Sequence, residues 1–128
     1  MPDKLIGTWR LNYHVETVAT LKPFQADVLL QGVREGDLDS WIMYEPRPLR
    51  VVIDYPIENP VELEISPKDY APKGHSSIGL LMYIIAKEYE QIYKNPKKHE
   101  IWGHGIGDLY FERITVNKNG QVELAIGS

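Results

Sequence analysis

The stretch from His99 to Glu112, HEIWGHGIGDLYFE, holds the residue types that most often do chemistry in proteins. It combines two histidines with carboxylates, a tryptophan and three glycines at alternate positions. Imidazole exchanges protons near neutral pH, and imidazole and carboxylate groups are also common metal ligands. The stretch therefore suits either metal binding or acid–base catalysis, provided that the rest of the chain completes the site.

Metal binding would require three or four ligands to converge at short range. His99, His104 and Asp108 supply nitrogen and oxygen donors, and His75 lies on a separate predicted loop. The chain has no cysteine, and none of the short zinc-binding signatures occurs in it. We therefore expect no metal and no cofactor.

A hydrolase would use His104 as the base, with Asp108 or Glu112 fixing its tautomer. A nucleophile is missing from this set, because Ser76 and Ser77 stand where they would cap a helix and no Gly-x-Ser-x-Gly elbow occurs. The glycines follow a predicted helix and precede a predicted strand, which is the reverse of the order that directs a helix N-terminus at phosphate. No catalytic residue is assigned, and His104 and Asp108 remain the weak candidates.

The same stretch is explained more simply as a structural turn. Glycines permit the backbone conformations that reverse the chain, Trp102 could seal the core, and Asp108 could accept bonds from backbone amides. Such a turn can also stand at the rim of a binding surface. Trp102, His104 and Asp108 are therefore candidate binding residues.

Two further candidates, Glu62 and Glu64, alternate with apolar residues in a predicted strand and so share one face of it. They could bind a shared cation or a basic partner, although a solvated outer face is the simpler interpretation.

The composition indicates a single globular domain over residues 1–128. With 43% hydrophobic and 25% charged residues, the chain can bury a core, and the net charge of −4 argues against binding to nucleic acid. The opening MPDKLIGTWR lacks the apolar core of a signal peptide, and no apolar run approaches the length that spans a bilayer. We expect a soluble, cytoplasmic protein without disulfides or membrane contact.

Apolar periodicity predicts five strands, then one helix, then two strands. The strands are expected at 5–17, 24–30, 41–44, 49–55, 61–65 and in a C-terminal hairpin, and the helix at 77–94. The expected fold is α+β, with a strongly curved, mainly antiparallel sheet of about seven strands wrapped around one long helix. Val28 and Leu30 are expected in its core.

The register of the C-terminal hairpin follows from its apolar residues. A three-residue loop at 118–120 places Val116 opposite Val122 and requires Gly120 at positive φ. In the first strand of this hairpin, Leu109 and Phe111 are out of phase with Ile114 and Val116. This change of phase predicts a bulge near 112–113.

The sequence Gly7-Thr8-Trp9, at the start of the first strand, resembles the Gly-x-Trp opening of lipocalin-like barrels. The resemblance covers three residues, and about five strands precede the helix here instead of the eight of such barrels. It implies, as an alternative, a barrel-like domain with a small-molecule pocket beside Trp9, Trp41 and Trp102.

The function expected from these features is that of a small, non-catalytic interaction protein. Its acidic surface and eight tyrosines would bind a protein partner, a basic one by charge complementarity, or a second copy of the chain. An inhibitor, a toxin-neutralising protein or a viral or phage accessory protein would fit. A small-molecule-binding domain is the alternative, and a hydrolase or metal-dependent enzyme at 99–112 is the second alternative.

Overall fold

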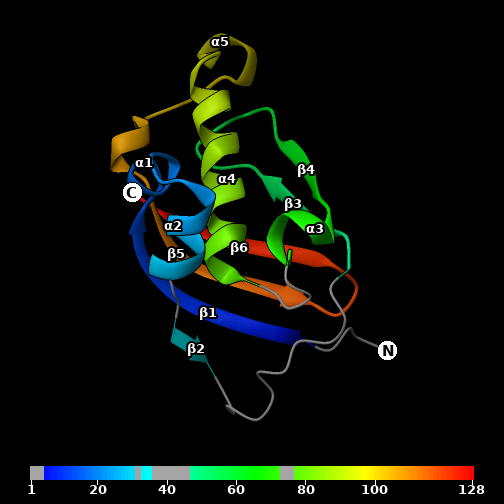
Figure 1. The fold of residues 1–128 in the computed structure, drawn as a ribbon. Helices are drawn as coiled ribbons and strands as arrows, with labels where there is room; N and C mark the ends of the chain where they lie inside the picture. The colour runs from blue at the N-terminus through cyan, green and yellow to red at the C-terminus, as the bar shows by residue number, and fades with distance from the viewer. Residues whose placement is uncertain (1–4, 31–32, 36–46, 73–76) are drawn as a thin grey trace.

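Helices cover one face of a mixed β-sheet in the computed structural model (Figure 1). The structure describes residues 5–30, 33–35, 47–72 and 77–128. Its strands are β1 Leu5–His14, β2 Val33–Glu35, β3 Leu49–Ile53, β4 Val61–Ile65, β5 Tyr110–Asn117 and β6 Gln121–Gly127. The order across the sheet is β2-β1-β5-β6-β3-β4, with β3 and β6 parallel and the other neighbours antiparallel.

The expectation of a strongly curved sheet of about seven strands is wrong. Within the described residues the sheet has five main strands, with the three-residue β2 at its edge, and it is neither closed nor strongly curved. The α+β class and the single long helix are confirmed. Because the sheet stays open, the barrel that the Gly7-Thr8-Trp9 resemblance implied is not formed. The expected strand at 41–44 lies outside the described residues.

The helices are α1 Val15–Ala19, α2 Pro23–Leu29, α3 Pro67–Tyr70, α4 Ile78–Tyr93 and α5 Pro96–His99, followed by a 3₁₀ turn, η2, Ile106–Asp108. The long helix α4 begins where the sequence predicted, because the Ser77 hydroxyl accepts a bond from the Leu80 amide at 3.1 Å. It ends before Asn95-Pro96. No helix among the described residues is long and apolar enough to cross a membrane.

The core lies between α4 and the sheet. Met82, Ile85 and Ala86 on α4 are fully buried, and they belong to the same cluster as Val51 and Ile114 on the strands. Helices α1, α2 and α3 contact α4 in turn. The predicted long helix is therefore the main element that packs against the sheet, but it lies on one face of an open sheet instead of being wrapped by a strongly curved one.

The C-terminal hairpin confirms the predicted register. Val116 pairs with Val122, the loop occupies 118–120, and Gly120 has φ 89°. The register shifts between Phe111 and Arg113, so the predicted bulge is also present. Local apolar pairing was enough to specify these features because a slip of one residue would expose every inward side chain.

The prediction of a strand at 24–30 is wrong, because this segment forms α2. Pro23 occupies the first turn of the helix, where its fixed φ is favourable and its missing N–H has no consequence. Ala26 and Leu30 are buried one helical turn apart, whereas Val28, expected in the core, is 52% exposed. The alternation of apolar residues along 24–30 did not exclude a helix, because a helix that buries only two of these residues needs no longer apolar pattern.

Gly79 provides a test of how α2 packs on α4. A Cβ added to Gly79 would stand 2.0 Å from the carbonyl oxygen of Ala26 and 2.7 Å from that of Leu30. We expect Gly79→Ala to lower the free energy of unfolding by about 1–3 kcal/mol, because the two backbones must separate. Denaturant unfolding measures this loss.

Gly105→Ala is the matched control. Gly105 has φ −81°, and no atom lies within 4 Å of its added Cβ. Its stability should change by no more than about 0.5 kcal/mol. Equal stabilities for the two variants would contradict the close contact between α2 and α4.

Candidate functional site

The loop that carries the candidate residues is attached to the connection between β3 and β4. The Trp102 amide donates to the Pro56 carbonyl at 2.8 Å, and Ile57 forms a β-bridge with Ile101. The chain reverses at Glu100 and Gly103, which have φ 52° and 77°. Of the three glycines that the sequence offered for this reversal, only Gly103 has positive φ.

Two tyrosines one turn apart on α4 hold both sides of the site. The Tyr89 hydroxyl donates to the Tyr55 carbonyl at 2.7 Å, and the Tyr93 hydroxyl donates to the His104 carbonyl at 2.9 Å. The backbones of Tyr55 and His104 are therefore fixed to the same helix. In the sequence both tyrosines are marked only by their helical spacing within 77–94, which does not reveal these bonds.

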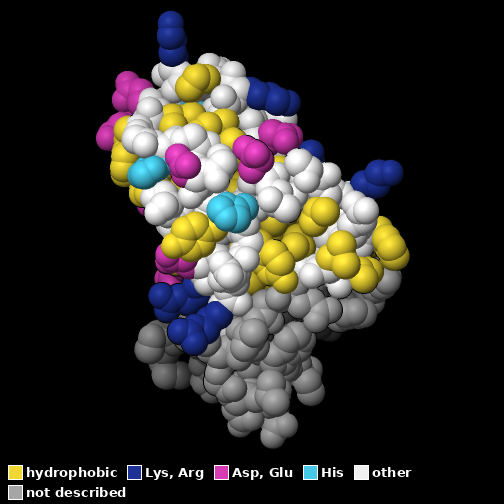
Figure 2. Space-filling model, turned by 90° about the vertical axis from the view of Figure 1, so that its left-hand side faces the viewer, with side chains coloured by type: hydrophobic (Ala, Val, Ile, Leu, Met, Phe, Trp, Pro, Cys, Tyr) yellow, Lys and Arg dark blue, Asp and Glu magenta, His cyan; other side chains and the backbone are white. Residues whose placement is uncertain are grey.

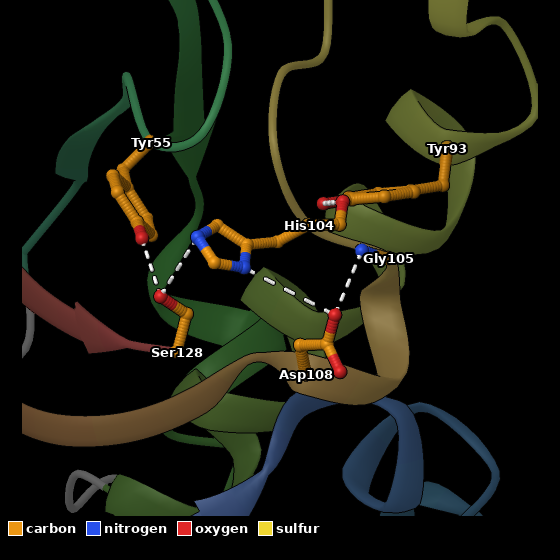
Figure 3. Close-up of polar contacts among 6 residues, drawn as sticks. All are labelled: Tyr55, Tyr93, His104, Gly105, Asp108 and Ser128. Atoms are coloured by element: carbon orange, nitrogen blue, oxygen red, sulfur yellow. Dashed lines mark hydrogen bonds and ion pairs between the residues drawn. The ribbon is translucent and has the colours of Figure 1, made fainter.

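The His104 side chain lies between two polar groups, as Figure 3 shows. Its Nε2 is 3.3 Å from the Ser128 hydroxyl, and its Nδ1 is 4.0 Å from Asp108 Oδ2. The second distance is too long for a hydrogen bond, but it permits an electrostatic interaction. The structure thus brings the predicted pair His104 and Asp108 close together without joining them directly.

Asp108 also has the structural role that the sequence suggested. Its Oδ2 accepts a bond from the Gly105 amide at 3.1 Å, which closes the turn that becomes η2. Its side chain is 63% exposed, so the carboxylate remains in contact with solvent.

Ser128, at the end of β6, is the residue of the site that sequence analysis missed. Its hydroxyl lies 2.5 Å from the Tyr55 hydroxyl as well as beside His104. No short motif marks it. The hairpin register could have located it, because the predicted bulge pairs Tyr110 with Gly127 and so places the next residue beside the glycine-containing loop.

An open groove of about 600 Å³ adjoins these residues. It is lined by Asn12, His14, His104, Asp108, Tyr110 and Ser128. A side-chain hydrogen bond to Glu112 raises the pKa of Tyr110 above its usual range. The Tyr110 hydroxyl donates this bond to Glu112.

Trp102 does not seal the core, contrary to the prediction. Its side chain is 43% exposed, and its ring meets the Tyr55 ring edge-on at 5.3 Å between centroids. The bond from its amide to Pro56 holds the backbone close to the connection after β3, while the indole remains at the surface.

The other sequence candidates lie apart from this groove. Glu62 and Glu64 are exposed on β4, opposite Val52 and Arg50. His99 lines a second groove, of about 540 Å³, beside α4 and α5.

The pocket predicted beside Trp9, Trp41 and Trp102 stays a prediction, because one of these three residues lies outside the described part of the chain. Trp9 is buried in β1, Trp102 is at the surface, and Trp41, like His75, lies outside the described residues. Within the part of the chain that the structure describes, no three His, Asp or Glu side chains are grouped so that they could hold a metal ion.

Comparison with protein-family models, with curated proteins and with solved structures finds no match for this chain. Roles for His104, Asp108 and Ser128 are therefore argued from geometry and chemistry alone.

The ionisation of Tyr93 tests whether α4 holds the loop. Burial, followed by the charge of Asp108, raises the pKa of Tyr93 from its ordinary value of 10 to about 12, and burial also raises the pKa of Tyr89. Because the fold favours the neutral phenol, the resulting stabilisation is complete below pH 10 and is lost as the pH rises through 12. Tyr93→Phe should remove one late-ionising phenol from an absorbance titration of the folded protein.

The same titration in denaturant is the control, because Tyr89 and Tyr93 should then ionise with the other tyrosines. If Tyr93→Phe instead removed a phenol that ionises near the ordinary pH of 10, α4 would not hold the loop through this hydroxyl.

Proposed function

We propose that this chain is an interaction protein that binds a protein partner through the outward face of α2. The observation that supports the proposal is the exposure of Phe24, Val28 and Leu29, at 74%, 52% and 60%. Figure 2 views the side of the molecule on which α1 and α2 lie, and hydrophobic side chains gather on part of this face. Grouped, exposed apolar side chains of this size are typical of binding surfaces.

Packing among the described residues gives no reason for these three side chains to be apolar. The inward side of α2 is already satisfied by Ala26 and Leu30, which pack against α4 at Gly79. A helix of seven residues also gains too little from its own hydrogen bonds to be stable alone, so α2 depends on this inward contact. The inward contact therefore places no restriction on the outward side chains of α2, which can serve binding.

The net charge of the chain bears on the kind of partner that would bind. With a net charge of −4, the protein would associate fastest with a partner that carries a basic rim. The acidic pair Glu62 and Glu64 lies on β4, away from α2, and therefore provides a separate surface against which the proposal can be tested.

The test replaces two exposed side chains of α2 in one variant, Phe24→Ser with Val28→Ser. Because both positions are exposed, unfolding stability should change little. Capture from cell extract, quantified by mass spectrometry, should show a partner bound to the wild type. The amount captured by the variant should be lower by at least about 30-fold, as for the removal of a hot spot. The captured protein is then purified and its affinity measured directly.

The matched control is Glu62→Gln with Glu64→Gln, which should keep the partner. Loss of binding in this control but not in the α2 variant would assign the interface to β4 and contradict the proposal. Sedimentation of the pure protein tests the alternative that a second copy of the chain covers this face. Self-association of the wild type that the α2 variant abolishes would show that alternative to be correct. Equal capture by both variants, with no self-association, would also contradict it.

A further inference from the structure

Ser128, His104 and Asp108 stand in the order used for nucleophilic catalysis, although they come from two separate parts of the chain (Figure 3). The serine hydroxyl lies 3.3 Å from Nε2 of the imidazole, and the carboxylate lies 4.0 Å from Nδ1. Each ring nitrogen therefore faces a different partner, one a hydroxyl and the other an anion. This is the division of roles that lets an imidazole accept a proton from a serine.

Asp108 lies on the Nδ1 side of His104, at a distance that permits an electrostatic interaction with the ring. A carboxylate beside Nδ1 favours the tautomer with the proton on Nδ1, which leaves the lone pair of Nε2 directed at the Ser128 hydroxyl. In this tautomer the Ser128 hydroxyl can donate to Nε2, and the serine oxygen can accept from the Tyr55 hydroxyl, 2.5 Å away. This arrangement would direct the serine proton at the base.

The groove beside Ser128 has room for a small substrate. Its volume of about 600 Å³ is open to solvent, and Asn12 lines it with an amide that can donate to a carbonyl oxygen. The rings of Tyr55 and Trp102, in edge-on contact, offer apolar surface beside the hydroxyl that touches Ser128.

The charge of the groove narrows the substrate class. Among the described residues that line it, there is no lysine or arginine, and Asp108 is an anion. An anionic substrate would therefore be repelled, whereas an uncharged ester would not.

We propose that Ser128 is a nucleophile, activated by His104, that accepts the acyl group of small uncharged carboxylic esters. The serine oxygen forms a bond to the carbonyl carbon while His104 Nε2 takes its proton. The bond from this carbon to the ester oxygen then breaks, and His104 returns the proton to the leaving alkoxide, which departs as the alcohol. Water, deprotonated by the same nitrogen, hydrolyses the acyl-serine to the carboxylic acid and restores Ser128.

This activity is independent of the proposed binding surface, because none of its residues belongs to α2. The α2 variant should therefore retain it in full.

The experiment treats the protein with p-nitrophenyl acetate and, separately, with a fluorophosphonate probe. Release of p-nitrophenol gives the rate, and peptide mapping by mass spectrometry locates the covalent group. We expect the covalent group on Ser128 and no covalent group in Ser128→Ala. The rate of p-nitrophenol release should fall by about 100-fold or more in His104→Gln, as for the loss of a general base. Circular dichroism melting checks that each variant is folded.

Asp108 is tested as a positioning residue. Asp108→Asn keeps an acceptor for the Gly105 amide but removes the charge, so the rate should fall about fivefold, the effect of one solvated charge at this distance. Asp108→Glu, which retains the charge, should recover part of this loss.

Two matched controls lie outside the site: His99→Gln, the same change at another histidine, and Ser66→Ala, at another exposed serine. Both should react like wild type. No covalent group on Ser128, a group spread over exposed serines such as Ser66, or an unchanged rate in His104→Gln would each overturn the proposal.

Discussion

The burial of one face of α4 against the sheet is the interaction on which the other contacts depend. Met82, Ile85 and Ala86 lose all contact with solvent there, which supplies the main driving force for placing the helix. Once α4 is fixed, α2 packs against its N-terminal turn at Gly79. The C-terminal half of α4 carries the two tyrosines that hold the site. A seven-residue helix and a glycine-containing loop thereby acquire defined positions that neither could hold alone.

Structural and chemical roles are combined in the same residues of the site. Tyr93 holds the backbone of His104 and leaves the imidazole free to face Ser128. Asp108 closes a turn through Oδ2, and the same oxygen lies 4.0 Å from Nδ1 of the ring. The two interpretations of residues 99–112, a structural turn and a reactive site, are therefore compatible. A turn that is held rigidly is what places an imidazole within reach of a hydroxyl.

Predictions from the sequence succeeded where neighbours along the chain decide the outcome. The extent of α4, its Ser77 cap, the register around Val116 and the bulge before Arg113 all follow from local apolar pairing and capping. They failed where burial decides. The segment 24–30 alternates like a strand but forms α2, because only Ala26 and Leu30 meet the core.

The sequence by itself determined the α+β class, the long helix and the closing hairpin, because each is encoded by periodicity within a short window. Only the tertiary structure decided that Trp102 would lie at the surface, that three apolar side chains would remain exposed on α2, and that Ser128 would meet His104 and Tyr55. These outcomes depend on distances between segments that are remote in the chain. Such distances are set by packing against α4, which no local pattern contains.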